Sequence, residues 1–101
     1  MKPWQQNYPK GVKTEINPNQ YQNIMEVFDE AVRKFRSQKA YTNMGRSLTF
    51  EEIDTAVGNF ASFLQHELKL KKGDRIAIQM PNLLQFPICL FGAFRAGLIV
   101  V

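Results

Sequence analysis

The segment from Lys71 to Val101 constrains the fold more than any other part of the chain. Within 76–80, large apolar residues alternate with smaller or polar ones, which is the period of a strand with one buried face. A long apolar segment follows and ends at Gly97, and the apolar run 98–101 predicts a second buried strand. A strand, crossover helix and strand in this order join parallel strands, nearly always with a right-handed connection. We therefore expect an α/β protein.

The crossover helix has two predicted boundaries. Asn82 is an N-cap residue with Gln85 as its capping-box partner, and Gly97 can end the helix in a left-handed conformation without steric cost. Pro87 then falls in the first turns, where the loss of its N–H matters least. The helix is apolar nearly all round but too short to span a membrane, so it requires more protein around it than 101 residues supply. We interpret the chain as a fragment of a larger α/β protein.

Two amphipathic helices are predicted before this unit. Asn23 with Glu26, and Thr49 with Glu52, form capping boxes ahead of apolar residues at helical spacing. Gly58 lies inside the second helix, where we expect it to permit close approach of another backbone. The expected apolar faces are Ile24, Val27, Phe28, Ala31, Val32 and Phe35 in the first helix, and Ile53, Val57, Phe60, Ala61, Phe63, Leu64 and Leu68 in the second.

Turn signals connect these elements. Residues 40–44 and 47–50 predict a short hairpin with Gly45 in its turn. Residues 70–74 predict the turn into the first parallel strand, with Gly73 as the turn residue.

Residues 1–20 contain several prolines among polar neighbours and predict an extended arm without a helix of its own. We expect residues 21–101 to form part of one domain. Trp4 and Tyr8 are too large to leave in water without reason, so we expect them to pack on the domain or on a partner, such as a second copy of the chain.

Composition limits the partners and the compartment. The formal net charge is +4, but the basic residues are spread along the chain and interleaved with acidic ones, which indicates a solvated surface and no nucleic-acid partner. One cysteine, Cys89, excludes a disulfide within the chain and fits a reducing compartment, where we expect it to be a small core hydrophobe. His66 is expected at a surface or helix end and not as a metal ligand. Residues 3–7 are not the apolar core of a signal peptide.

Sequence patterns typical of catalytic or phosphate-binding sites are not found. The glycines are too widely spaced for a phosphate-binding loop. Glu51 and Glu52 are adjacent, so on a helix they point about 100° apart and cannot flank one reacting bond. Asp74 and Arg75 are expected at a turn and strand entry. We therefore expect no catalytic, cofactor-binding or metal-binding residue in the chain.

Several stretches in order nevertheless resemble the start of the adenylate-forming acyl-CoA synthetase (AMP-binding) superfamily. They are Ser47-Leu-Thr-Phe-Glu-Glu-Ile-Asp54, Leu70-Lys-Lys-Gly-Asp-Arg-Ile-Ala-Ile-Gln-Met-Pro-Asn82 and Phe94-Arg-Ala-Gly-Leu-Ile-Val-Val101. Tyr8-Pro9, Thr14-Glu-Ile-Asn-Pro-Asn-Gln-Tyr21 and Asn43-Met-Gly45 are similar, more narrowly, to bacterial long-chain fatty acid–CoA ligases. The resemblance implies the N-terminal part of the large domain of the adenylate-forming fold: a βαβ unit with parallel strands, a short hairpin and amphipathic helices.

The resemblance also implies a two-step reaction in the full-length enzyme. ATP and Mg²⁺ activate a fatty acid as an acyl-adenylate with release of pyrophosphate, and CoA then takes the acyl group as a thioester. The family's nucleotide-binding and catalytic motifs lie beyond the equivalent of Val101, so we expect this chain alone to be inactive. Its matching residues are scaffold, with Thr49 and Asn82 as caps, Gly73 as a turn and Gly97 as a helix stop; Gly58 departs from the alanine-rich middle of that family helix.

Alternatives remain open at this point. The chain is either such a fragment or a non-catalytic interaction or dimerisation module, and medium-chain or aryl acids are the alternative substrates. The resemblance implies a cytoplasmic protein with peripheral contact at the inner membrane, although no segment of the chain demands it. A homodimer is a further hypothesis.

Overall fold

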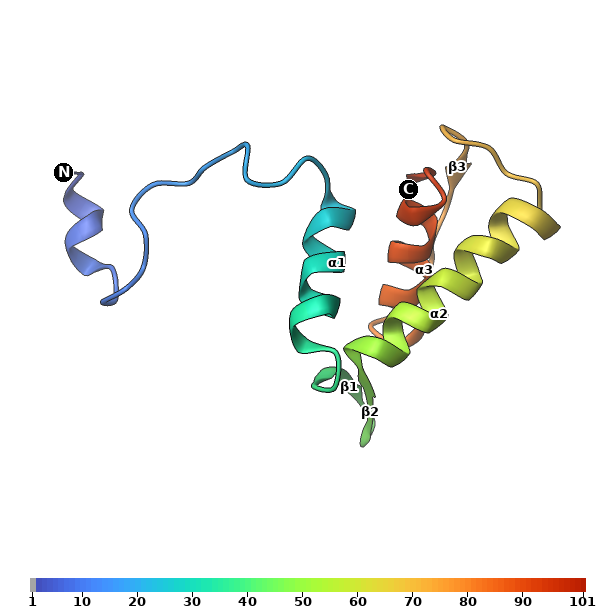
Figure 1. Cartoon of the computed structure of the whole chain (residues 1–101), viewed down its shortest axis with the longest axis horizontal. Helices are drawn as coiled ribbons and strands as arrows, with labels where there is room; N and C mark the ends of the chain where they lie inside the picture. The colour runs from blue at the N-terminus through green and yellow to red at the C-terminus, as the bar shows by residue number, and fades with distance from the viewer. Residues whose placement is uncertain (1) are drawn as a thin grey trace.

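The computed structural model describes residues 2–101 and places three helices, a hairpin and a parallel strand pair in one body, from which the N-terminal arm projects (Figure 1). The elements are the 3₁₀-helix η1 (Pro3–Asn7), α1 (Ile24–Phe35), β1 (Lys39–Asn43), β2 (Arg46–Thr49), α2 (Phe50–Ser62), the π-helical turn η2 (Phe63–Glu67), β3 (Arg75–Ile76), α3 (Gln85–Arg95) and β4 (Ile99–Val100). The predicted mixed α/β class is confirmed.

The arm differs from the sequence prediction because it contains η1. Pro3 presets the helical φ, and Lys2 N–H donates to Gln5 Oε1 at 2.9 Å, which closes the first turn. The arm lies away from the helical body (Figure 1), and Trp4 and Tyr8 are 55% and 40% exposed. The expectation that they pack on the domain is therefore wrong, whereas packing on a partner stays a prediction.

Both predicted helix starts before the βαβ unit are present. Asn23 Oδ1 accepts from Glu26 N–H at 3.0 Å, although the Glu26 carboxylate accepts from Gln22 N–H rather than from the cap residue. The Thr49–Glu52 box is complete, with two reciprocal hydrogen bonds of 3.1 Å. These caps satisfy backbone N–H groups that have no partner within the helix.

The hairpin between α1 and α2 turns where the sequence predicted. Strands β1 and β2 pair antiparallel, with Asn43 opposite Arg46 and an irregularity between Lys39 and Tyr41. Met44 and Gly45 both have positive φ, at 50° and 80°, as a two-residue type I′ turn requires.

The strands of the βαβ unit are parallel, as predicted, but shorter than expected. Only Arg75 with Ile99 and Ile76 with Val100 form the regular ladder. A further hydrogen bond of 3.0 Å joins Ile78 N–H to the carbonyl of Val101, the last residue of the chain. Residues 79–80, which continue the alternating pattern, therefore lie outside the paired strand.

The predicted start of α3 at Asn82 is wrong, because the helix begins at Gln85 with Leu84 as the N-cap and no side-chain cap. Pro87 explains the shift. A start after Asn82 would set the Pro87 ring against the Leu83 carbonyl, whereas the observed start puts Pro87 third in the helix, where no intrahelical N–H bond is needed.

The end of α3 matches the prediction. Gly97 has φ 79°, and its N–H donates to Phe94 O at 2.9 Å while Leu98 N–H donates to Ala93 O at 3.0 Å. This pair of bonds is the Schellman arrangement, which returns the chain toward β4.

The core consists of two clusters that share α2. Ala61, Leu64, Ala93, Ala96 and Leu98 form one, and Phe28, Val32, Ile53 and Val57 form the other. Helix α1 buries only Phe28 and Val32, so its predicted apolar face is wider than the surface that packs against the body. Ile24, Val27 and Phe35 of α1, and Phe63 and Leu68 beyond the end of α2, are 43–56% exposed, contrary to expectation.

Across residues 2–101, every helix is too short or too polar to cross a membrane.

Candidate functional site

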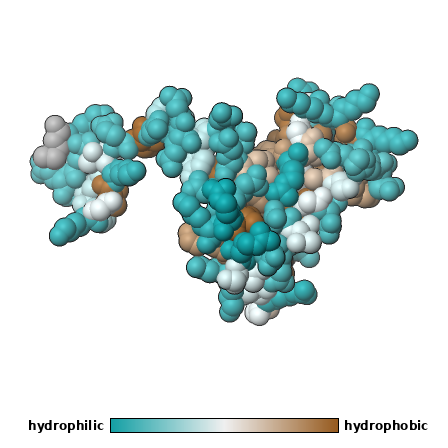
Figure 2. Space-filling view, in the orientation of Figure 1, coloured by the Kyte–Doolittle hydropathy of each residue, from teal (hydrophilic) through white to brown (hydrophobic). Residues whose placement is uncertain are grey.

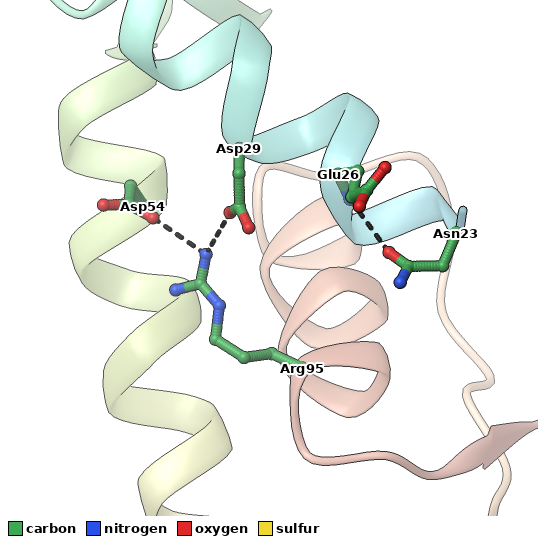
Figure 3. A network of polar contacts seen from close by, with 5 residues as sticks. All are labelled: Asn23, Glu26, Asp29, Asp54 and Arg95. Carbon is green, nitrogen blue, oxygen red and sulfur yellow. Dashed lines mark hydrogen bonds and ion pairs between the residues drawn. The ribbon is translucent and has the colours of Figure 1, made fainter. Parts of the chain in front are cut away.

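Arg95, in the last turn of α3, joins the three helices through one side chain (Figure 3). Its Nη2 donates to Asp54 Oδ1 on α2 at 2.9 Å and to Asp29 Oδ1 on α1 at 3.0 Å. The guanidinium carbon also lies 5.7 Å from the centroid of the Phe28 ring, within the range of a cation–π contact. We call Arg95, Asp29, Asp54 and Phe28 the arginine junction.

The burial of the arginine junction indicates a structural role. The Arg95 and Asp54 side chains are 30% and 33% exposed, and that of Asp29 is 57% exposed, so the pair with Asp54 is the less screened by water. The positive charge also lies at the C-terminal end of α3, where the helix dipole favours it. Both carboxylates are engaged by the same guanidinium, which links α1 and α2 to α3.

The geometry revises the role expected for Gly58. A Cβ built at Gly58 would lie 3.6 Å from Arg95 Nη1, an ordinary contact with a side chain and not with a backbone. The close approach occurs instead at Gly92, where a Cβ would lie 2.6 Å from Phe60 Cδ1.

A cavity of about 450 Å³ lies beside the arginine junction, lined by Asn23, Ile24, Met25, Asp29, Phe94 and Arg95. Its polar side chains already have partners, because Asn23 caps α1 while Asp29 and Arg95 pair with each other. The cavity therefore offers neither a nucleophile nor a set of metal ligands.

A second hollow of about 340 Å³ separates the hairpin from the start of α3. It is lined by Tyr41, Thr42, Asn43, Asn82, Leu83, Leu84, Phe86, Pro87, Leu90 and Phe91. Asn43 Nδ2 donates to the Asn82 carbonyl at 3.2 Å and ties the two walls together. This apolar groove can receive an apolar group, but its lining contains no titratable side chain other than Tyr41.

The reactive side chains of the described chain are dispersed. Residues 2–101 contain no group of three His, Cys, Asp or Glu side chains placed to hold a metal ion. Burial raises the pKa of the Cys89 thiol, which disfavours the nucleophilic thiolate. His66 is exposed in η2, as predicted for a surface or helix-end residue.

The scaffold residues named from the sequence do not converge on one site. Thr49 caps α2, and Gly73, with φ 91°, turns the chain toward β3, while Asn82 serves only as a backbone acceptor. Arg95 was missed as a junction residue. The available signal was its position as a lone charge in an apolar helix, which requires counter-charges from elsewhere in the fold.

This arrangement is also found in solved structures of adenylation proteins. The fold matches an artificially fused adenylation–PCP di-domain, NpsA-ThdA, from Klebsiella oxytoca with a TM-score of 0.71 and 26% identity, over 75% of this chain and 14% of that one. It matches the apo structure of Mycobacterium smegmatis MbtA with a TM-score of 0.70 and 29% identity, over 74% of this chain and 14% of that one. The fold is therefore that of part of an adenylation domain.

The sequence comparisons are more specific. The model of the AMP-binding enzyme family matches residues 28–101, and the chain belongs to this family. It is 49% identical over 100 residues to a long-chain-fatty-acid–CoA ligase of Escherichia coli O6:H1, covering 99% of this chain and 18% of that protein. It is 51% identical over 98 residues to the Haemophilus influenzae protein of the same name, covering 97% of this chain and 17% of that protein. The chain thus spans less than a fifth of the length of these relatives.

Proposed function

We propose that the chain is part of an ATP-dependent long-chain fatty acid–CoA ligase, which forms acyl-CoA, AMP and pyrophosphate through an acyl-adenylate. The observation that carries this proposal is the identity of about half of all residues, over nearly the whole chain, to proteins with that name.

Long-chain acids are favoured over aryl acids as substrates by the same comparisons. The similarity to a Mycobacterium tuberculosis salicyl-AMP ligase is lower, at 34% identity over 80 residues and 74% of the chain. A Bacillus subtilis long-chain-fatty-acid–CoA ligase, by contrast, aligns over 99% of the chain at 35% identity.

Within such an enzyme, residues 1–20 are proposed as an arm and residues 21–101 as part of the AMP-binding domain. The proposed role of these residues is scaffold, and ATP, Mg²⁺ and CoA are proposed to bind elsewhere in the longer protein. This proposal is supported by the arrangement of residues 2–101, in which the two carboxylates of the arginine junction share the single charge of Arg95 and the positive-φ glycines each form a separate turn. We therefore assign no step of the reaction to the described side chains.

Two partners are proposed in addition to fatty acid and CoA. The first is the cytoplasmic surface of a membrane, touched peripherally. The second is another copy of the chain, supported by the exposed Trp4 and Tyr8 of the arm. A non-catalytic interaction module is the alternative function supported by the same exposed residues.

The test is acyl-CoA formation by the full natural gene product with ATP, Mg²⁺ and CoA. Palmitate is expected to be the best substrate, octanoate poorer, and salicylate inactive. Preference for salicylate would contradict the long-chain proposal, and no acyl-CoA from any acid would favour the interaction module. The isolated 101-residue chain is expected to be inactive, so acyl-adenylate formation by it would contradict the scaffold role.

A further inference from the structure

The corner between α2 and β3 combines exposed apolar and basic side chains. Phe63 and Leu68 are 45% and 52% exposed. Leu68 N–H donates to Phe63 O at 3.2 Å, the i→i+5 bond of a π-helical turn, so the two residues lie one turn apart on the same side of η2. Phe63 stacks on Phe60 on its inner side, so about half of each of the two side chains forms a small exposed apolar surface.

Basic residues follow directly. Lys69 has φ 54° and reverses the chain after η2, so that Leu70 turns inward to the core. The next basic residues are exposed; we call Phe63, Leu68, Lys69, Lys71, Lys72 and Arg75 together the basic corner.

The acidic residues nearby do not cancel the positive charge. Glu67 and Asp74 are the acids of the segment 63–75, which leaves four basic against two acidic side chains, a net charge of +2. The Asp74 carboxylate is occupied by the backbone, because its Oδ2 accepts from Lys71 N–H at 2.7 Å. The lysine ammonium groups remain available to an external anion.

The basic corner lies at the opposite end of the long axis from the arm (Figure 1). In the space-filling view, teal residues at this right-hand end stand around brown and pale ones (Figure 2). A small apolar centre with basic side chains around it is suited to the headgroup region of a membrane. There the cations contact anionic lipids and the apolar groups reach the boundary of the acyl chains.

We propose that the basic corner binds the surface of an anionic lipid bilayer. The charge complementarity between its lysines and acidic headgroups favours this partner over nucleic acid, which calls for a continuous basic stripe or several aromatic platforms. The inference rests on the proposed peripheral membrane contact, to which it adds the surface and the lipid class.

The test is flotation of the full natural gene product with phosphatidylcholine vesicles, prepared with and without phosphatidylglycerol. The charge variant K69N/K71Q/K72Q uses asparagine at position 69 because it tolerates positive φ. Leu68→Gln removes an apolar contact without changing charge. The matched control K10Q/K13Q/K39Q removes the same charge from the arm and β1. Circular dichroism verifies that each variant is folded.

Binding is expected only to vesicles with phosphatidylglycerol. The charge variant is expected to weaken it about a hundredfold, the loss for three basic side chains near an anionic surface, and Leu68→Gln several-fold. The control is expected to stay within about twofold of the parent. Equal losses of binding in the charge variant and the control would overturn the proposal. Unchanged binding in both corner variants would also overturn it, and is the result expected if another part of the longer protein covers the corner. Acyl-CoA formation with albumin-bound palmitate, measured without vesicles, reports separately on the proposed function.

Discussion

Arg95 shows how one residue can set the arrangement of separate helices. A single guanidinium nitrogen bonds to carboxylates on α1 and α2, while the stem of the side chain belongs to α3. A lone charge in an apolar helix is costly unless it is paired, so the three helices are held in the arrangement that brings both aspartates to it.

Replacing Arg95 is therefore expected to loosen the three-helix body. Arg95→Met keeps an unbranched side chain but leaves Asp29 and Asp54 without their partner, with an expected loss of about 1–2 kcal/mol in the free energy of unfolding. Urea denaturation of the purified chain measures this loss. Arg36→Met is the control, because its pair with Glu51 is exposed on both sides and screened by water, so its removal is expected to change the free energy of unfolding far less. Equal losses in both variants would contradict the special role of Arg95.

Two helix glycines are expected to respond to alanine with opposite signs. Gly92→Ala places a Cβ 2.6 Å from Phe60 Cδ1, so the Phe60 side chain must move and stability is expected to fall by about 1–3 kcal/mol. Gly58→Ala meets only the Arg95 side chain at 3.6 Å, so helix propensity is expected to raise stability by about 0.5–1 kcal/mol. Thermal unfolding measures both, and two changes of the same sign would contradict the packing described.

At the scale of elements, local patterns determine where helices begin and end. The capping box of α2 needs only Thr49 and Glu52, three residues apart, and the stop of α3 needs only Gly97. The start of α3 shows the limit of such patterns: Asn82 and Gln85 have the spacing of a capping box, but Pro87 moves the helix start beyond them.

The capping box of α2 predicts a contribution to stability that depends on pH. The Thr49 backbone N–H, and secondarily its hydroxyl, hold the pKa of Glu52 below its ordinary value of 4.5. A lowered folded-state pKa stabilises the fold above the ordinary pKa, and this contribution is lost as pH falls through the lowered value. Glu52→Gln is therefore expected to flatten the fall in unfolding free energy on the acid side, measured by urea denaturation at a series of pH values.

The controls for this prediction separate charge from capping. Glu15→Gln, in the arm and outside both core clusters, is the control for the loss of one carboxylate charge. Thr49→Ala removes the cap itself and is expected to cost about 1 kcal/mol already at neutral pH. If Glu52→Gln left the slope unchanged, the carboxylate would not be the group that the cap stabilises.

The sequence predicted the elements better than their contacts. Both amphipathic helices, the hairpin turn and the parallel strand pair follow from periodicity, caps and glycines within a few residues of one another. The arginine junction does not, because Asp54 and Asp29 lie 41 and 66 positions before Arg95. The exposed side of α1 was predicted as core for the same reason. The apolar face follows from residues within the helix, whereas the area that α2 and α3 cover depends on residues far along the chain.

At the scale of the whole molecule, the chain divides into a body and an arm. Helix α2 contributes to both core clusters and so holds the body together. The arm contributes no buried residue to either cluster and leaves Trp4, Tyr8 and Val12 exposed. This difference in packing predicts that the arm opens to proteolysis independently of the body.

Brief trypsin treatment is expected to cut first after Lys10 and Lys13 and to leave the body intact, as mass spectrometry would show. Other lysines are exposed in the turn before β3, but there Gly73 N–H donates to Gly97 O at 2.9 Å and Asp74 binds the Lys71 backbone, so the chain cannot readily extend into a protease. Equal cleavage rates at Lys10 and Lys71 would contradict this division. The protein concentration distinguishes a free arm from one that docks on a second copy. A free arm is cut at the same fractional rate at every concentration. Docking of Trp4 and Tyr8 on a partner is expected to slow cleavage as the concentration rises, and Trp4→Ala is expected to abolish that slowing.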